Sequence, residues 1–415
     1  MTNEWVNMGI NGVSWLFDTS RFSTFFISTA IIVYACFRSL NNEKQEILLL
    51  PNDETAEDRE KLIDPPSDLK GEAAVALDMK GHNEHYRENK LVDDKYENFQ
   101  MLNSTQALLL PLGASVTLLL MFYFFDSMQV AMTISTACIA CLAFAFLLLP
   151  CCKFFLNSVS VTLPLKKLPF KALDNFTVTH VMAFLISLFL VFMWIKTGHW
   201  LLMNALGLGL CVSFISYVKL PSLKVSILLL FGLLIYDIFW VFFSARLFKS
   251  NVMLHVATRS ADNPAFLLFR NHHFEGSNSQ HPSDANHNGM VPKLSLPVKL
   301  FFPSSKNSGH FSMLGLGDIV MPGLLLCFLL RFDSQKNDNL PLDHKPTRKK
   351  LSYFQCSMIG YFIGLMIATL SSEIFKAPQP ALLYLVPFTI IPILIMAYFK
   401  GDLRRMWNEP FVSLK

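Results

Sequence analysis

The stretch LLIYDIFWVFF, residues 233–243, places one aspartate, Asp237, inside an otherwise apolar segment. A second stretch, SMLGLGDIVMPG at residues 312–323, does the same with Asp318. An ionisable side chain at membrane depth costs free energy unless it is paired, protonated or in contact with water, so it marks a functional site by default. The two aspartates are therefore candidate functional residues of a membrane protein.

The composition also indicates a membrane protein. Of the 415 residues, 52% are hydrophobic and only 16% are charged, whereas about 25% of a soluble globular chain is charged. The formal net charge of +4 is too small to indicate a nucleic-acid partner. The expected surroundings are the lipid bilayer, and a homo-oligomer within it is compatible with the sequence. The eight cysteines suggest no disulfide framework, and we expect Cys138 and Cys141, a C-x-x-C inside an apolar run, to serve packing.

Apolar windows occur at nine places along the chain. A helix that spans a bilayer needs about 20 mostly apolar residues. The windows cover residues 22–37, which is slightly short, 106–125, 128–149, 178–195, 200–218, 222–243, 313–330, 354–374 and 381–399. The expected fold is an all-α polytopic membrane protein with nine transmembrane helices.

The polar segments between these windows set the expected domain organisation. An acidic cytosolic loop at 38–104 has too few apolar residues to build a core, so we expect it to be disordered. The predicted divisions are the exoplasmic N-terminus and first span at 1–37, that loop at 38–104, spans two to five at 105–218, the sixth span at 219–245, a hydrophilic exoplasmic loop at 246–312, the seventh span at 313–331, a basic cytosolic loop at 332–353, the last two spans at 354–399 and a tail at 400–415.

The orientation follows from the basic residues, because lysine and arginine in short loops collect on the cytoplasmic side. One set of alternate loops, with the tail, holds most of them, whereas the opposite set holds Arg21, Lys196 and Lys376. This imbalance predicts an exoplasmic N-terminus and a cytosolic C-terminus. The N-x-S/T sequons at Asn103 and Asn175 then fall on the cytosolic side, where no glycan would be added.

The two aspartates are expected to form a catalytic pair. Asp237 lies six residues before the end of its window, and Asp318 lies about as far into the next one. At a rise of about 1.5 Å per residue, both lie roughly 9 Å below the exoplasmic boundary on antiparallel helices. Two neighbouring carboxyls share a proton, so one can activate water while the other donates to the developing oxyanion. The residues alone do not identify the base.

Glycine and proline surround Asp318. Gly315 and Gly317 remove side chains just before it, which allows a helix or a substrate backbone to approach. Pro322, four residues later, has no N–H and leaves the Asp318 carbonyl without its helical donor. The alternative is a simple helix kink.

A small β-hairpin is predicted in the loop between the sixth and seventh spans. Residues 293–300 alternate between apolar and polar types, and Val252, Leu254 and Val256 do likewise. Such alternation is typical of strands, and Pro297 favours an edge strand. We expect residues 293–300 or the segment 379–382 to pair with an unwound substrate; the alternative is a hairpin that only caps the membrane face.

Three short motifs together resemble a known family. They are Y-D at Tyr236 and Asp237, G-x-G-D at Gly315, Gly317 and Asp318, and P-A-L at Pro380, Ala381 and Leu382. Their order, spacing and membrane placement resemble the presenilin and signal peptide peptidase intramembrane aspartic proteases. The similarity covers nearly all of residues 101–411 and is greatest for the signal-peptide-peptidase-like branch, but it does not include the insertion at 42–100 or the stretch at 271–289.

The resemblance implies an aspartic endopeptidase with Asp237 and Asp318 as catalytic residues, and with the other motif residues supporting the active site. It implies that the substrates are type II membrane proteins such as Golgi glycosyltransferases, cleaved in or beside their spans. It also implies a place in the Golgi first, with the endoplasmic reticulum and plasma membrane as further locations. No non-protein cofactor or metal is implied.

Two other classes of protein fit a pair of intramembrane carboxyls. A proton-coupled transporter or cation channel would use the pair to relay protons or bind ions, although no inverted repeat is evident. A non-catalytic chaperone or trafficking receptor would use the pair as a structural contact. Binding of an aspartic-protease transition-state analogue separates the protease from both alternatives.

Overall fold

The computed structural model describes residues 19–48, 102, 104–158, 178–248, 252–258, 261–262, 293–294, 296–303, 311–338, 351–375 and 379–408. Most of the predicted acidic loop, the asparagines of both sequons and the stretch at 271–289 lie outside these residues.

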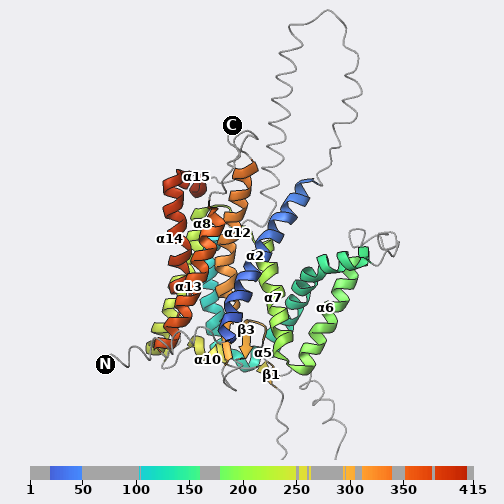
Figure 1. Ribbon diagram of the computed structural model, residues 1–415. Coiled ribbons are helices and arrows are strands. Elements are labelled where there is room, and N and C mark those ends of the chain that lie inside the picture. Colours follow the sequence, from blue (N-terminus) through green and yellow to red (C-terminus); the bar gives the residue numbers. More distant parts are fainter. Residues whose placement is uncertain are drawn as a thin grey trace, which may run out of the picture.

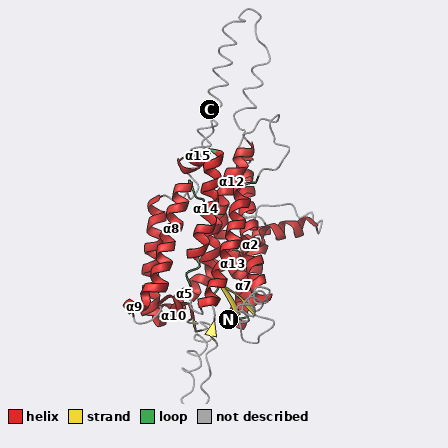
Figure 2. Cartoon of the chain, turned by 60° about the vertical axis from the view of Figure 1, so that its left-hand side comes forward, coloured by secondary structure: helices red, strands yellow, loops and turns green. Residues whose placement is uncertain are grey.

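The described part of the chain is mainly helical (Figure 2). The helices are α2 (Thr19–Leu48), α5 (Ser104–Ser158), α6 (Val178–Thr197), α7 (Trp200–Tyr217), α8 (Leu223–Ile238), the π-helix η2 (Phe239–Phe243), α9 (Ser244–Phe248), α10 (Val252–Thr258), α12 (Leu316–Asp338), α13 (Tyr353–Phe375), α14 (Leu382–Lys400) and α15 (Leu403–Asn408). The strands are β1 (Ala261–Asp262), β2 (Lys293–Leu294), β3 (Lys299–Pro303) and β4 (Phe311–Gly315).

Eight helical segments in the described residues are long and apolar enough to cross a membrane. α5 supplies two of them, Ser104–Phe125 and Ser127–Ser158, with a kink at Phe124. α8, η2 and α9 form one continuous span that ends at Phe248, five residues beyond the predicted window. With α12 as the ninth long helix, the prediction of an all-α multi-pass membrane protein is confirmed.

The helix α12 lies at the centre of the bundle. It contacts α2, α7, α8, α13 and α14, and Figure 1 shows it among these helices, with α6 at the periphery. Residues 319–332 of α12 are almost all buried. Because other helices cover it, α12 can carry charged residues that a lipid-facing helix would exclude.

The first span is longer than predicted, because α2 continues to Leu48 instead of ending near residue 37. Glu43, in this extension, is buried and accepts two hydrogen bonds from Arg331 of α12, at 2.7 and 3.0 Å. Lys219 lies 3.6 Å from the same carboxylate. The extension looks hydrophilic in sequence, but these partners compensate the burial of its charge.

The hairpin before α12 differs in detail from the prediction. β3 pairs antiparallel with β4, so that Leu300 lies opposite Leu314 and Phe301 opposite Met313. Residues 293–300 do not form one strand: Lys293–Leu294 pairs with β1, and Pro297 lies in a turn before β3. Proline fits that turn because it fixes φ and needs no hydrogen-bond acceptor for an N–H.

The strand predicted around Val252, Leu254 and Val256 is wrong, because these residues lie in the helix α10. The alternation is too short to separate the two periodicities, since Val252 and Val256 also share one face of a helix. α10 packs against α5, where His255 contacts the Phe122 ring at a centroid distance of 5.5 Å.

Candidate active site

Asp237 lies on α8, two residues before the π-helix η2 begins at Phe239. Its side chain is buried, and its Oδ2 atom accepts a hydrogen bond of 3.3 Å from the Leu382 backbone N–H. A π-turn inside a helix is frequent at functional sites. The aspartate is thus held inside the bundle by a main-chain donor from a distant part of the chain.

The P-A-L segment provides this donor at the start of α14. Pro380 and Leu382 are buried, and Ala381 is the N-cap of the helix. The first N–H groups of a helix have no intrahelical acceptor, and the positive end of the helix dipole favours a carboxylate. The beginning of α14 is therefore a stabilising partner for Asp237.

Asp318 is the third residue of α12 and is partly exposed. Its carboxyl group lies within electrostatic range of Asp237, and α12 is in contact with α8. The prediction that the seventh span is helical from residue 313 is wrong, because residues 311–315 form β4 and α12 starts only at Leu316. The hairpin takes the place of the first turns of the predicted span.

The two glycines before Asp318 have different surroundings. A β-carbon on Gly315 would lie 3.2 Å from the Asp318 Oδ2 atom, so a side chain there would crowd the carboxylate. A β-carbon on Gly317 would have no neighbouring atom within 4 Å. The nearby Asp318 carboxylate therefore explains the lack of a side chain at Gly315, whereas open space lies beside Gly317.

Tyr236 is partly buried beside Asp237, and its ring centroid lies 6.5 Å from that of Trp240. Trp240 in turn donates from Nε1 to Ser115 of α5 at 3.2 Å. Tyr236 thus belongs to an aromatic group that packs α8 and η2 against α5.

Asn204 on α7 supports the hairpin and was not among the predicted site residues. Its Nδ2 atom donates to the Phe301 carbonyl at 2.7 Å, and its Oδ1 atom accepts from the Phe301 N–H at 2.9 Å. Thr24 of α2 and Ser312 of β4 share a further hydrogen bond of 3.1 Å. A buried asparagine inside an apolar window was the available signal, since polar side chains within spans are seldom without a partner.

Tyr361 on α13 was also missed. Its hydroxyl donates to the Asp318 backbone carbonyl at 3.4 Å. This is the carbonyl that Pro322, inside α12, cannot serve with an N–H, and the Tyr361 hydroxyl is a donor to it that the sequence did not reveal.

In the described residues, no group of three or more metal-ligating side chains occurs. All eight cysteines are free thiols.

Comparison with known proteins identifies the family. The family model for signal peptide peptidase matches residues 94–413. The chain belongs to the signal peptide peptidase family.

The relatives agree with this assignment. Signal peptide peptidase-like 1 from Oryza sativa subsp. japonica is 36% identical over 347 residues, which cover 80% of this chain and 89% of the relative. Signal peptide peptidase-like 1 from Arabidopsis thaliana is 36% identical over 321 residues, covering 75% of this chain and 83% of the relative. Intramembrane protease 2 from Caenorhabditis elegans is 34% identical over 212 residues, which is 51% of this chain and 38% of that protein. Membership in this family makes the protein a multi-pass intramembrane protease.

Proposed function

We propose that the protein is an aspartic endopeptidase that uses Asp237 and Asp318 to hydrolyse peptide bonds within the membrane. The observation that carries the proposal is the meeting of three distant segments. Asp237 of α8 interacts with Asp318 of α12, while the start of α14 donates a backbone N–H to Asp237. Two neighbouring carboxyls cannot both ionise easily, so they favour a shared proton, which is the state that peptide hydrolysis requires.

The reaction follows from this shared proton. The ionised carboxylate removes a proton from water while the water oxygen bonds to the peptide carbonyl carbon, and the other carboxyl donates its proton to the carbonyl oxygen. In the second step the C–N bond breaks, the amine nitrogen takes a proton from one carboxyl, and the diol returns a proton to the other. The pair then holds one proton again.

We propose that β4 holds the substrate in an extended form. Asn204 hydrogen-bonds to both the N–H and the C=O of Phe301, so these two groups point away from β4. Phe301 and Met313 are therefore a pair of opposite residues that share no backbone hydrogen bond, and the N–H and C=O of Met313 also point outward, away from β3. The Met313 side chain is 55% exposed. This edge leads through Gly315 to Asp318 and suits strand addition better than the segment 293–300, which does not form one continuous strand.

The finer parts of the proposal concern substrate and location. We propose that the substrates are type II membrane proteins such as Golgi glycosyltransferases and that the main location is the Golgi. The predicted exoplasmic N-terminus supports this orientation of substrate, because the direction in which a span enters the site depends on how the protease itself crosses the bilayer.

The test is cleavage of a tagged type II substrate by purified protein in a defined bilayer. We expect Asp237→Asn and Asp318→Asn each to abolish cleavage, with a loss of at least about 1,000-fold, because each change removes the shared proton. Glu373→Gln is the matched control, since Glu373 is an exposed carboxylate at the C-terminal end of α13 that pairs with Arg21.

Substantial cleavage by either asparagine variant would contradict the two-aspartate mechanism. A wild-type protein that cleaves type I but not type II substrates would contradict the substrate proposal alone. Labelling of the wild-type protein by an aspartic-protease transition-state analogue provides a readout that does not depend on the choice of substrate.

A further inference from the structure

The first turn of α12 contains a gap in its backbone hydrogen bonding. In a regular α-helix the carbonyl of Asp318 would accept from the N–H of residue 322. Residue 322 is proline, which has no N–H, and the helix nevertheless continues to Asp338. The turn that presents the Asp318 carboxyl therefore lacks one of the bonds that would otherwise fix its geometry.

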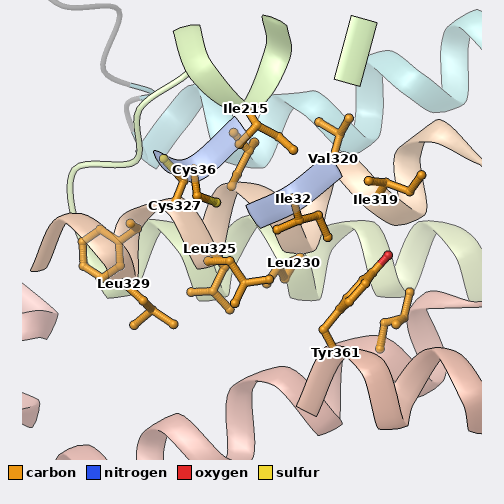
Figure 3. Close-up of a cluster of buried hydrophobic side chains, with 14 of the residues drawn as sticks. Ile32, Cys36, Ile215, Leu230, Ile319, Val320, Leu325, Cys327, Leu329 and Tyr361 are labelled. Atoms are coloured by element: carbon orange, nitrogen blue, oxygen red, sulfur yellow. The ribbon is translucent and has the colours of Figure 1, made fainter. Parts of the chain in front are cut away.

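The Tyr361 side chain fills this gap from outside the helix. Its hydroxyl donates to the Asp318 carbonyl at 3.4 Å, and the residue is fully buried, with an exposed fraction of 0%. Figure 3 shows the Tyr361 ring extending from its helix toward the turn that carries Ile319. A tyrosine hydroxyl is rarely buried without a polar partner.

Two further helices lie beside this hydroxyl. Ser28 of α2 and Cys211 of α7 are both close enough to Tyr361 to interact with it. Ser28 and Cys211 are themselves fully buried. Buried residues of α2 and α7 thus lie around a hydroxyl that α13 carries, and this is the arrangement expected of a fixed support.

The same device occurs elsewhere in the chain. Pro150 in α5 leaves the Phe146 carbonyl without its helical donor, and Arg38 of α2 donates to that carbonyl. The Leu147 carbonyl next to it receives a second bond from Arg38 at 3.2 Å. A side chain that replaces the N–H missing at a proline is thus a recurring solution in this protein.

We infer that Tyr361 is a positioning residue for the protease reaction: its hydroxyl replaces the donor missing at Pro322 and so fixes the turn that aims the Asp318 carboxyl at Asp237. The inference rests on the proposed catalytic role of the two aspartates. Tyr361 bonds to the backbone of Asp318 and acts through it, without contact to the reacting atoms.

The test combines two substitutions. Tyr361→Phe keeps the ring and removes only the donor, so we expect kcat to fall roughly five- to tenfold with little change in KM, because a lost hydrogen bond has about this effect. Pro322→Ala alone restores a backbone N–H and is expected to cleave at close to the wild-type rate. The double variant Tyr361→Phe/Pro322→Ala is expected to recover most of the lost rate, because the new N–H serves the Asp318 carbonyl.

Each outcome decides for or against the inference. Full activity of Tyr361→Phe overturns it, and so does a double variant as slow as Tyr361→Phe, which would assign Tyr361 a role in packing or elsewhere. Thermal unfolding in detergent shows whether each variant is folded. Asp318→Asn and wild-type protein are assayed in parallel: cleavage by Asp318→Asn would refute the proposed function itself, whatever the Tyr361 variants do.

Discussion

The Asn204 side chain holds β3 with the two hydrogen bonds that a neighbouring strand would otherwise supply. A primary amide carries one donor and one acceptor in the same geometry as a peptide group, so it can satisfy the N–H and C=O of a single residue. Asn204 is 6% exposed, and its partner is the backbone of Phe301. One side chain thus closes the outer edge of β3 and leaves β4 as the edge beside Asp318.

We expect Asn204→Leu to destabilise the protein by about 1–3 kcal/mol, because the Phe301 N–H and C=O would lose their partners in a buried place. The measurement is the thermal unfolding midpoint in detergent, together with the rate of substrate cleavage, which should also fall. Ser135→Ala is the control, since Ser135 is exposed and its hydroxyl bonds only to its own helix, at Met132. Equal midpoints for Asn204→Leu and Ser135→Ala would show that the amide does not hold the hairpin.

At the scale of helices, the position of the P-A-L segment depends on how closely α13 and α14 approach. Gly360 and Gly364 form a G-x-x-x-G pair on α13, a pattern that lets helix backbones come into contact. A β-carbon on Gly360 would lie 2.1 Å from the Phe388 carbonyl oxygen, and one on Gly364 would lie 3.2 Å from the Leu385 Cα atom. Pro392 in α14 has no N–H to donate to that Phe388 carbonyl. The backbone of Gly360 therefore packs beside a carbonyl that lacks its helical donor.

We expect Gly360→Val to abolish cleavage and transition-state-analogue labelling, because the added side chain must push α14 away and move the Leu382 N–H from Asp237. Ile359→Val is the matched control on the same helix, since Ile359 is 55% exposed. Both variants are compared for folded yield by size-exclusion chromatography and for analogue labelling. Normal labelling of Gly360→Val would mean that the close contact of α13 and α14 does not position the site.

At the scale of the whole molecule, the two ends of the bundle are built differently. Figure 1 shows α15 at one end, and α10 with the strands at the opposite end. At the α15 end, Asp402 pairs with Lys336. It also accepts a hydrogen bond of 2.6 Å from the hydroxyl of Tyr353, which lies on α13. Burial opposes ionisation of Asp402, but these hydrogen bonds and the charge of Arg405 outweigh it, so its pKa is lowered.

The predicted orientation assigns the hairpin end to the exoplasmic side. We expect glycosylation sequons engineered into 260–290 to be modified in cells and sequons engineered into 45–90 to remain unmodified, as the distribution of basic residues requires. The measurement is an endoglycosidase-sensitive shift in apparent mass. The reverse pattern would show that the molecule has the opposite orientation in the bilayer and would remove the support for type II substrates.

Local sequence was sufficient for the spans and for the candidate residues. A bilayer demands long apolar helices, and this requirement is met residue by residue along the chain, so hydropathy finds the spans without knowledge of their neighbours. Asp237 and Asp318 stand out for the same reason, as carboxyls in apolar surroundings. The effect of Pro322 on the Asp318 carbonyl is likewise local, because it depends only on a missing N–H four residues away.

Tertiary structure decided the features whose partners lie far away in sequence. α2 extends through a polar stretch because Glu43 meets Arg331, 288 positions along the chain. Phe311–Gly315 became a strand because β3 and Asn204 offer it a framework, although the segment continues the apolar pattern of the following helix. The hydroxyl of Tyr361 found the free carbonyl of Asp318 only through packing of α13 on α12. The bilayer requires each spanning segment to be apolar, and this requirement is visible in the sequence of the segment itself. Hydrogen bonds and ion pairs between segments depend instead on the assembled fold.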